Sequence, residues 1–284
     1  MGIIYAFYNP LVGNHLCGKK IRELERFYTQ PIRYCDMTCE ETYREVLPAI
    51  GAEDQLVLCG GDGTLNRFIN RTQAMELPEE IYYYPCGSGN DFARDLGRSP
   101  EDGPFEIKRY LCNLPTIRVN GREERFLNGI GYGIDGYCCE AADEIRRENP
   151  SKEINYTKIA LKGLLYAYKP TNAEVTVDGV TRRFCKVWMC PTMKGRYFGG
   201  GIMATPGQDR LDSERRLMLM VLHDIGNLHT LMLFPSVFTG KHVKYKKYVE
   251  FMQGKEITVK FDRPTALQID GETVLGVTEY TAVL

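Results

Sequence analysis

Short apolar runs separated by polar, glycine-containing turns fill the first 115 residues. The runs Ile3–Tyr8, Leu56–Cys59 and Ile81–Tyr84 are rich in β-branched and aromatic residues, which favours buried strands. Between them, apolar residues recur at helical spacing, as in the group Leu65, Phe68 and Ile69. Strands that alternate with helices predict a parallel α/β sheet with right-handed crossovers.

Two further helical stripes are expected in this half of the chain. Ile21, Leu24, Phe27 and Tyr28 share one face, and a second helix opens at Thr38-Cys39-Glu40-Glu41 in the manner of a capping box.

The pattern changes near Leu114 to short alternating runs with frequent turns, which predicts an antiparallel, sandwich-like second domain. A helical insertion at about 156–168 interrupts it. We therefore expect a Rossmann-like α/β domain over residues 1–115 and a β-sandwich domain over residues 116–284. The expected strands are Thr116–Val119, Glu174–Val177, Lys186–Met189, Leu217–Leu222, Ile257–Phe261 and Leu267–Ile269.

The turn Gly60-Gly61-Asp62-Gly63-Thr64 follows the second predicted strand and opens a helix. Glycines allow backbone N–H groups to approach a ligand closely, and a helix N-terminus favours an anion such as phosphate. Thr64 is placed to cap the helix. Asp62 would repel phosphate unless a cation or a hydroxyl lies between them, which indicates nucleotide chemistry. The alternative is a tight turn in which Asp62 is merely solvated.

Polar loops also follow the other two predicted strands. Asn9-Pro10 ends the first, and Gly87-Ser88-Gly89-Asn90-Asp91 ends the third. Open α/β sheets bind ligands at the carboxyl ends of their strands, so these loops converge on one expected site. The segment Gly13–Lys20 resembles a Walker A loop but has Lys20 where Ser or Thr would bind magnesium, and it is weak evidence for a P-loop.

Three motifs in the second half have competing interpretations. Gly131–Gly136 fits the dinucleotide pattern by spelling, but we interpret it as a loop between strands. Asp209, Asp212 and Glu214 could hold a magnesium or calcium ion, although a solvated acidic turn has the same spacing. Asp270-Gly271 follows an apolar run and is, taken alone, typical of a hairpin turn.

Composition narrows the class of protein. Lys and Arg total 36 against 37 Asp and Glu, so bulk charge indicates neither nucleic-acid nor membrane attraction. The 10 cysteines contain no Cys-x-x-Cys pair, which favours reduced thiols over a zinc site or disulfides. No signal sequence or transmembrane run is recognisable, so we expect a cytoplasmic protein.

Taken in order, five segments resemble the diacylglycerol kinase catalytic-domain family, the bacterial lipid kinases related to sphingosine and ceramide kinases and, more distantly, to NAD kinases. The segments are Asn9-Pro10, Gly60–Thr64, Gly87–Arg94, Phe198–Gly201 and Asp270-Gly271-Glu272. The resemblance implies an NAD kinase/diacylglycerol kinase-like fold with ATP bound between the two domains.

The resemblance also implies roles for individual residues. Glu272, with Asp270 beside it, would be the general base, and Asp62 and Asp91 would belong to a magnesium and water network around the triphosphate. The nucleotide would be held by Asn9, Pro10, Thr38, Gly60, Gly61, Asp62, Gly63, Thr64, Asn66, Arg67, Ser88, Asn90 and Asp91.

The function implied is an ATP- and magnesium-dependent lipid kinase, acting on the hydroxyl of a diacylglycerol-like or other amphipathic alcohol at the membrane surface. The alternative is a nucleotide-binding regulatory protein of the same fold, because Leu114–Ile117 stands where many family members have an Asp. An NAD kinase-like enzyme is a third option.

The sequence does not identify the lipid. Leu161, Leu164, Leu165 and Tyr168 on the inserted helix are candidates to line its pocket. Lys241–Lys247 is a basic segment that could dock on a membrane or simply be a solvated face.

Overall fold

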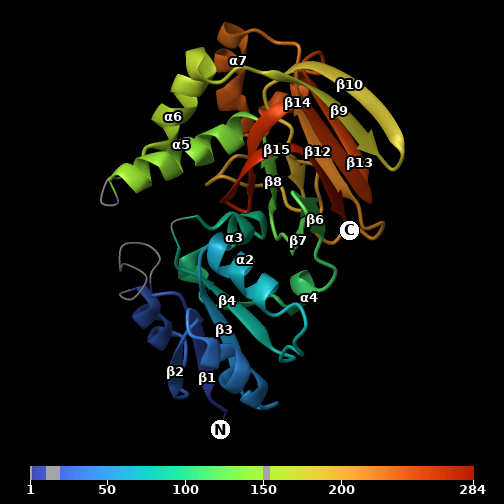
Figure 1. The fold of residues 1–284 in the computed structure, drawn as a ribbon. Coiled ribbons are helices and arrows are strands. Elements are labelled where there is room, and N and C mark those ends of the chain that lie inside the picture. Colours follow the sequence, from blue (N-terminus) through green and yellow to red (C-terminus); the bar gives the residue numbers. More distant parts are fainter. Residues whose placement is uncertain (1, 11–19, 88, 150–153) are drawn as a thin grey trace. The chain divides into compact units, whose positions relative to one another are not determined.

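The computed structural model describes residues 2–10, 20–87, 89–149 and 154–284 (Figure 1). The chain divides into two compact units, Met1–Leu114 and Pro115–Leu284. Each unit has its own sheet and its own core.

The first unit is built on a five-stranded sheet in the order β2-β1-β3-β4-β5. The first four strands in this order run parallel and β5 is antiparallel to β4. Its strands are β1 (Ile4–Tyr8), β2 (Ile32–Asp36), β3 (Gln55–Gly60), β4 (Ile81–Pro85) and β5 (Phe105–Glu106). The three predicted strands are confirmed. The pattern did not reveal β2, because this edge strand alternates polar and apolar residues over only five positions.

Helical segments of the first unit connect these strands. They are η1 (Ile21–Arg26), η2 (Thr42–Val46), η3 (Leu47–Ala49), α2 (Asp62–Arg71), α3 (Asp91–Asp95), η4 (Pro100–Asp102) and α4 (Lys108–Leu111). Helix α2 buries Leu65, Phe68 and Ile69, as their spacing predicted.

Two capping predictions were wrong. The helix begins at Asp62 with Gly61 as its N-cap, so Thr64 lies inside the first turn, with its side chain against Gly60. Thr38 does not cap a helix either, because its N–H and hydroxyl both donate to the Asp36 carboxylate, each over 2.7 Å.

The second unit is a ten-stranded antiparallel sheet that curls around its core. The path runs β13-β12-β11-β8-β14-β15-β6-β7, and β9 joins β14 to β10. Its strands are β6 (Thr116–Val119), β7 (Arg122–Arg125), β8 (Gly129–Tyr132), β9 (Thr171–Val177), β10 (Val180–Val187), β11 (Thr192–Met193), β12 (Leu217–Leu222), β13 (Val249–Gly254), β14 (Glu256–Ile269) and β15 (Glu272–Val283). The predicted strands are present, and the two runs at Ile257–Phe261 and Leu267–Ile269 belong to the single long strand β14.

Helices cover one side of this sheet (Figure 1). They are α5 (Ile134–Glu148), α6 (Tyr156–Lys162), η5 (Gly163–Ala167), α7 (Asn227–Leu233), η6 (Phe234–Val237) and η7 (Lys241–Lys244). The insertion predicted at 156–168 is α6 with η5.

The loop predicted at Gly131–Gly136 was wrong. Strand β8 ends at Tyr132 and α5 begins at Ile134, with Gly133 between them at φ 122°. Helix α5 then lies directly on β14, because a Cβ on Gly136 would come within 2.0 Å of the Ala266 carbonyl oxygen. The glycine spacing thus reflects helix packing on a strand.

Aromatic side chains fill the core of the second unit. The rings of Tyr132 and Phe261 stack with centroids 3.8 Å apart, and the Tyr132 hydroxyl donates to the Val277 carbonyl over 2.6 Å. The Trp188 indole donates to the Ile225 carbonyl over 2.9 Å, so the polar groups of these two side chains have partners.

The described ranges contain no disulfide. Within the same ranges, no helix combines the length and apolar character that crossing a bilayer requires.

Candidate functional site

The carboxyl ends of four parallel strands bring together most of the predicted nucleotide-binding residues. Asn9 follows β1, Thr38 follows β2, the glycine turn at 60–63 follows β3, and Gly87 follows β4. Parallel strands end at the same edge of their sheet, so these segments share one rim of the first unit. The predicted residue Ser88 lies outside the described residues.

The two glycine loops of this rim are in direct backbone contact. A Cβ on Gly87 would lie 2.4 Å from the Gly61 Cα, and one on Gly61 would lie 2.7 Å from the Gly89 carbonyl oxygen. The Gly60 carbonyl accepts from the N–H groups of Cys86 and Gly87 over 3.0 and 3.1 Å. Glycine is therefore required at 61 and 87 because any side chain would separate the loops.

The Asp62 carboxylate connects α2 to the next helix. Its two oxygens accept from the N–H groups of Asp91 and Phe92, over 2.8 and 2.9 Å. These N–H groups begin α3, where helical backbone donors have no partner within the helix. Asp62 thus fixes the start of α3 and presents Asp91 beside it. The Asp91 carboxylate is almost fully buried and lies 3.5 Å from the Arg94 guanidinium.

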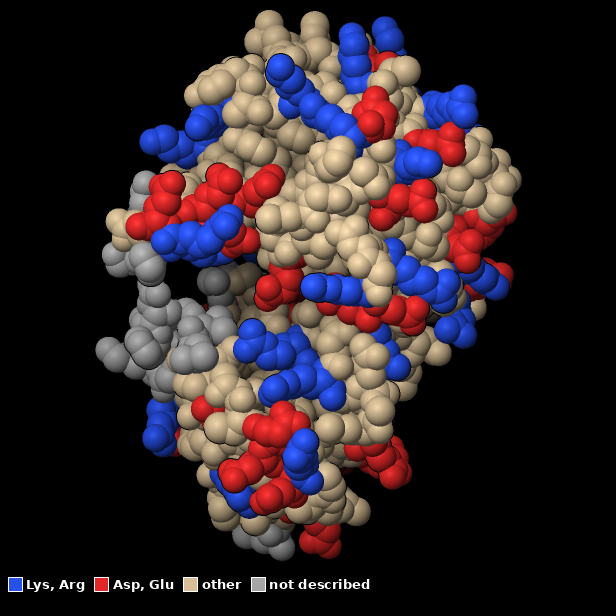
Figure 2. Space-filling view, viewed as in Figure 1, with Lys and Arg blue, Asp and Glu red and all other residues tan. Residues whose placement is uncertain are grey.

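The first turn of α2 is exposed at Gly63. Within the part of the chain that the structure describes, a Cβ on Gly63 would meet no atom within 4 Å, in contrast to Gly60 and Gly61. Thr64 and Asn66 are buried in the helix, whereas Arg67 is exposed. Figure 2 shows basic side chains gathered over α2, and Arg71, on the same helix, is also exposed. Arg71 is the last residue of α2, and its guanidinium pairs with Glu40 and donates to the Met37 carbonyl. Backbone donors, the helix N-terminus and Arg67 are the groups of this rim that suit phosphate.

In the second unit, Asp270 and Gly271 form the two-residue turn between β14 and β15. Both have positive φ, 47° and 96°, and Ile269 pairs with Glu272 across the turn. This is a tight β-hairpin, as the Asp-Gly pair predicted. Glu272, the predicted base, is the first residue of β15, and its side chain is exposed.

The Asp270 carboxylate organises the strand beside this hairpin. It accepts from the backbone N–H groups of Leu127, Asn128 and Gly129 over 2.5, 2.8 and 3.0 Å. Three backbone donors on one buried carboxylate make it a positioning group for the turn that carries Glu272. This geometry favours positioning over proton transfer as the role of Asp270.

Arg210 supports the same segment from the loop before β12. It is buried, its guanidinium donates to the Leu127 carbonyl over 2.7 Å, and it also bonds the Asn128 side chain. Lys194 lies close by, and burial, with the charge of Arg210, lowers its pKa to about 8. The sequence pattern indicated neither residue, since both lie outside any motif.

A further carboxylate lies near Glu272. Glu124 is on β7, opposite Ile117 of β6. Burial, followed by the negative charges of Asp270 and Glu272, raises the pKa of Glu124. This chain has no Asp at Leu114–Ile117, yet the neighbouring strand supplies a carboxylate.

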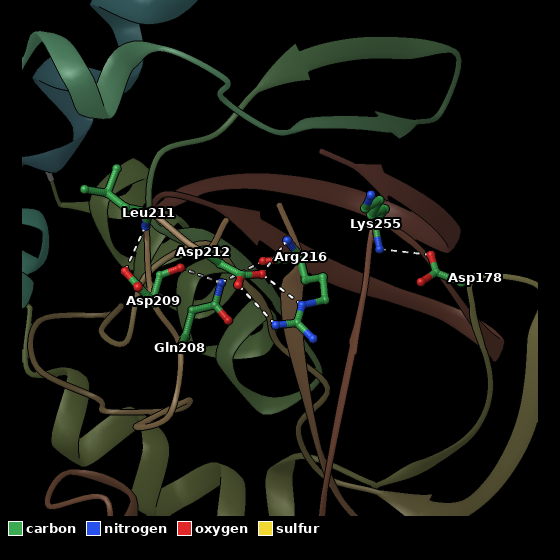
Figure 3. A network of polar contacts seen from close by, with 7 residues as sticks. All are labelled: Asp178, Gln208, Asp209, Leu211, Asp212, Arg216 and Lys255. Atoms are coloured by element: carbon green, nitrogen blue, oxygen red, sulfur yellow. Dashed lines mark hydrogen bonds and ion pairs between the residues drawn. The ribbon is translucent and has the colours of Figure 1, made fainter. Parts of the chain in front are cut away.

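The acidic loop after Gly207 is internally paired (Figure 3). The Arg216 guanidinium donates to both oxygens of Asp212, over 2.9 and 3.1 Å, and lowers the pKa of Asp212 to about 2. Asp209 accepts from the Leu211 N–H over 2.9 Å. Among the described residues, no group of three metal-ligating side chains is close enough to hold an ion. A metal role for Asp209, Asp212 and Glu214 stays a prediction without support from this geometry.

Asp135 is a buried carboxyl group that the sequence pattern concealed. It lies in the first turn of α5, and neither side-chain oxygen has a hydrogen-bond partner. Burial raises its pKa to about 7. A Cβ on Gly131 would lie 2.0 Å from its Oδ2 and 2.5 Å from the Gln268 Nε2, so the glycine leaves room for both side chains.

A parallel α/β unit with a glycine-rich rim and an antiparallel β unit with an exposed carboxylate define a two-domain protein of the α/β plus β-sandwich class. Residues 4–113 match the profile described as the diacylglycerol kinase catalytic domain. Residues 128–283 match the YegS C-terminal NAD kinase beta sandwich-like domain. The chain belongs to the diacylglycerol kinase family, and its predicted fold class is confirmed.

Named relatives agree with this family. The chain is 25% identical over 244 residues to YtlR of Bacillus subtilis, a candidate lipid kinase by name, covering 80% of this chain and 76% of that protein. It is 24% identical over 256 residues to a diacylglycerol kinase of Mycobacterium tuberculosis, covering 86% and 81%. The crystal structure of a candidate diacylglycerol kinase from Bacillus anthracis has the same fold, with a TM-score of 0.68 at 19% identity, covering 99% of this chain and 92% of that one.

Proposed function

We propose that this protein is an ATP-dependent lipid kinase that transfers the γ-phosphoryl group to the hydroxyl of a diacylglycerol-like or other amphipathic alcohol. The observation that carries the proposal is the cradle of the first unit, where two touching glycine loops meet the N-terminus of α2 and Gly63 is exposed. Family membership supports a kinase, and the cradle supports a nucleotide as its phosphoryl donor.

The cradle suits the phosphates of ATP. Helix α2 has ten residues, so its N-terminus carries a full helix dipole, and Gly63 allows close approach. Arg67, in the second turn of the same helix, is exposed and can meet negative charge. We assign phosphate binding to Gly61, Gly63 and Arg67, while Asp62 holds the second loop in place.

The donor set fits magnesium. Magnesium takes oxygen ligands and is usually bound through one or two carboxylates together with substrate phosphates. Asp62 and Asp91 supply two carboxylates on one rim, and an ionised carboxylate keeps acceptor sites beyond the bonds described above. When bound, the ion would neutralise charge on the phosphates.

The acceptor hydroxyl needs a general base only as charge develops on its oxygen during phosphoryl transfer. In phosphoryl transfer most of the catalysis is positioning and charge neutralisation. We assign the base to Glu272: the hydroxyl proton goes to its carboxylate, the alcohol oxygen bonds to the γ-phosphorus, and the bond to the β,γ-bridging oxygen breaks. The products are a phosphorylated lipid and ADP. Asp270 holds the turn on which Glu272 lies.

The test is phosphoryl transfer from ATP with magnesium to a panel of alcohols in mixed micelles. We expect lipid-dependent product with the wild type and a loss of at least about 100-fold in kcat with Glu272→Gln, which keeps the shape but removes the base. Glu279→Gln, at an exposed position of the same strand, is the matched control and should keep full activity. Equal activity in all three proteins would remove Glu272 from the mechanism.

A nucleotide-binding regulatory role is the second candidate. It is favoured by Leu114–Ile117, which lacks the Asp that many family members have. Calorimetry with ATP separates the two functions: nucleotide binding without transfer to any alcohol in the panel would favour the regulatory protein.

A further inference from the structure

Two segments of the second unit have an unusual composition. Residues 156–170 and 225–248 contain seven lysines and no Asp or Glu, although the chain as a whole has 37 acidic residues. All seven lysines are exposed, three on the first segment and four between Lys241 and Lys247. Each segment is therefore a locally cationic surface in a protein of net charge −1.

The same two segments also expose apolar side chains. Among the described residues of this unit, twelve large apolar side chains are exposed, and nine of them lie in these segments. The other three are Val180, Leu211 and Leu275. Tyr166, Leu228 and Met232 are the most exposed of the nine, at 67%, 66% and 62%. Exposure of this kind is a mark of an interaction surface when it is contiguous.

Contacts make the two segments contiguous. Helix α7 packs against η5, and the two lie together in Figure 1. The Asn227 side chain, at the start of α7, donates to the Leu164 and Leu165 carbonyls over 3.3 and 3.2 Å. The element that carries Leu165 and Tyr166 therefore packs against the helix that carries Leu228 and Met232, and η6 links that helix to the lysines of η7. We call these two segments together the basic apolar face.

The inserted helix is divided between core and surface. Leu164 and Tyr168 are buried, whereas Leu161 and Leu165 are about half exposed. The buried pair anchors the helix, and the exposed pair has no partner in the core that would explain it. The acidic boundary of the face is α5, which carries Glu140 and Glu144; Figure 2 shows acidic side chains over α5 and basic ones over α6.

We propose that the basic apolar face docks this protein on an anionic lipid bilayer, with Leu165, Tyr166, Leu228 and Met232 inserted among the headgroups. This inference rests on the proposed function, since a kinase for a bilayer lipid must work at a bilayer. Apolar and tyrosine side chains surrounded by lysines are the composition that enters a membrane interface, and lysines match anionic headgroups. Protein–protein interfaces are depleted in lysine, whereas these two segments carry seven, which favours a bilayer over a protein partner.

The test is sedimentation of the full chain with vesicles. One set is phosphatidylcholine alone, and the other contains about one third phosphatidylglycerol. We expect binding to the anionic set, weakened by high salt because the lysines are exposed. Leu228→Ser combined with Met232→Ser should lower the partition coefficient at least about tenfold, since two large apolar side chains are lost from the interface.

Val180→Ser is the matched control, because Val180 is exposed to the same 66% as Leu228 but lies outside the face. It should bind as the wild type does. Equal binding by the control and the double variant would overturn the proposal. Failure of the wild type to bind either set of vesicles would also overturn the proposal. If the double variant differs from the wild type only in oligomeric mass, the face instead binds a second copy of this chain.

Activity separates this proposal from the kinase proposal. With a short-chain, water-soluble diacylglycerol the double variant should phosphorylate as fast as wild type, whereas with the long-chain lipid in anionic vesicles it should be slower by about the same tenfold. Absence of transfer to either acceptor would reject the kinase and leave the vesicle-binding result standing.

Discussion

Asp270 is the residue on which the hairpin beside Glu272 depends. Its carboxylate accepts three backbone N–H groups, and an amide in its place has a single acceptor oxygen. We expect Asp270→Asn to lower the free energy of unfolding by about 1–3 kcal/mol, because buried donors lose their partner. Urea denaturation measures this change.

Asp178→Asn is the control for that measurement. Asp178 also accepts two backbone N–H groups, from Lys255 and Glu256 over 2.9 Å each, but at an exposed position (Figure 3). Water can replace those bonds, so the cost should be smaller. A larger loss at Asp178 than at Asp270 would contradict the structural role of the buried carboxylate.

Asp135 makes stability depend on pH. Its pKa rises from 3.8 to about 7 on folding, because burial disfavours the ionised form. The unfolded chain therefore releases this proton at lower pH than the folded chain does, so the group destabilises the fold progressively between pH 3.8 and about 7.

We accordingly expect Asp135→Asn to gain stability over wild type across that interval, with the difference constant at higher pH and on the order of a few kcal/mol. Thermal unfolding over a pH series measures it. Glu144→Gln, at an exposed position of the same helix, should show no such trend. A difference that does not vary with pH would mean that Asp135 titrates normally.

At the scale of elements, substitutions at two glycines of these loops should separate an effect on stability from an effect on nucleotide binding. Gly87→Ala places a methyl group 2.4 Å from the Gly61 Cα, so the loops must move apart and stability should fall by about 1–3 kcal/mol. Gly63→Ala meets nothing within 4 Å and improves helix propensity by up to about 1 kcal/mol.

Nucleotide affinity should respond differently in these two variants. The methyl of Gly63→Ala occupies the open space at the helix N-terminus, so we expect weaker ATP binding by calorimetry together with unchanged or higher stability. Unchanged ATP affinity in Gly63→Ala would mean that the phosphates do not bind at the N-terminus of α2.

At the scale of the whole molecule, ATP should act through the first unit. Ligand binding to the folded state raises the free energy needed to open the bound segments. The increase is about 2.7 kcal/mol at a ligand concentration 100 times Kd. We expect ATP with magnesium to slow hydrogen exchange of the backbone at 60–67 and 89–94, and to leave the β9–β10 hairpin unchanged. Slower hydrogen exchange confined to the second unit would contradict nucleotide binding at the cradle.

The strands and their loops follow from local patterns in this chain. β1, β3 and β4 are short apolar runs ended by polar turns, and such runs are buried whatever surrounds them. The Gly60–Thr64 turn and the Asp270-Gly271 hairpin were predictable for a related reason, since their backbone conformations need particular residues. The short edge strand β2 and helix α5 were not predictable in this way, because their sequences fit more than one local structure.

By itself, the sequence determined the order of the strands along the chain, the loops at their carboxyl ends and the chemistry of the residues in those loops. Tertiary structure alone decided the surroundings of each carboxylate. Asp62 accepts from the backbone of α3, Asp270 accepts from the backbone after β7, and Asp212 pairs with Arg216. Asp135 is buried without a hydrogen-bond partner. The reason is physical. Local conformation depends on neighbours in sequence, whereas the charge state and role of a carboxylate depend on burial and on donors that are distant along the chain.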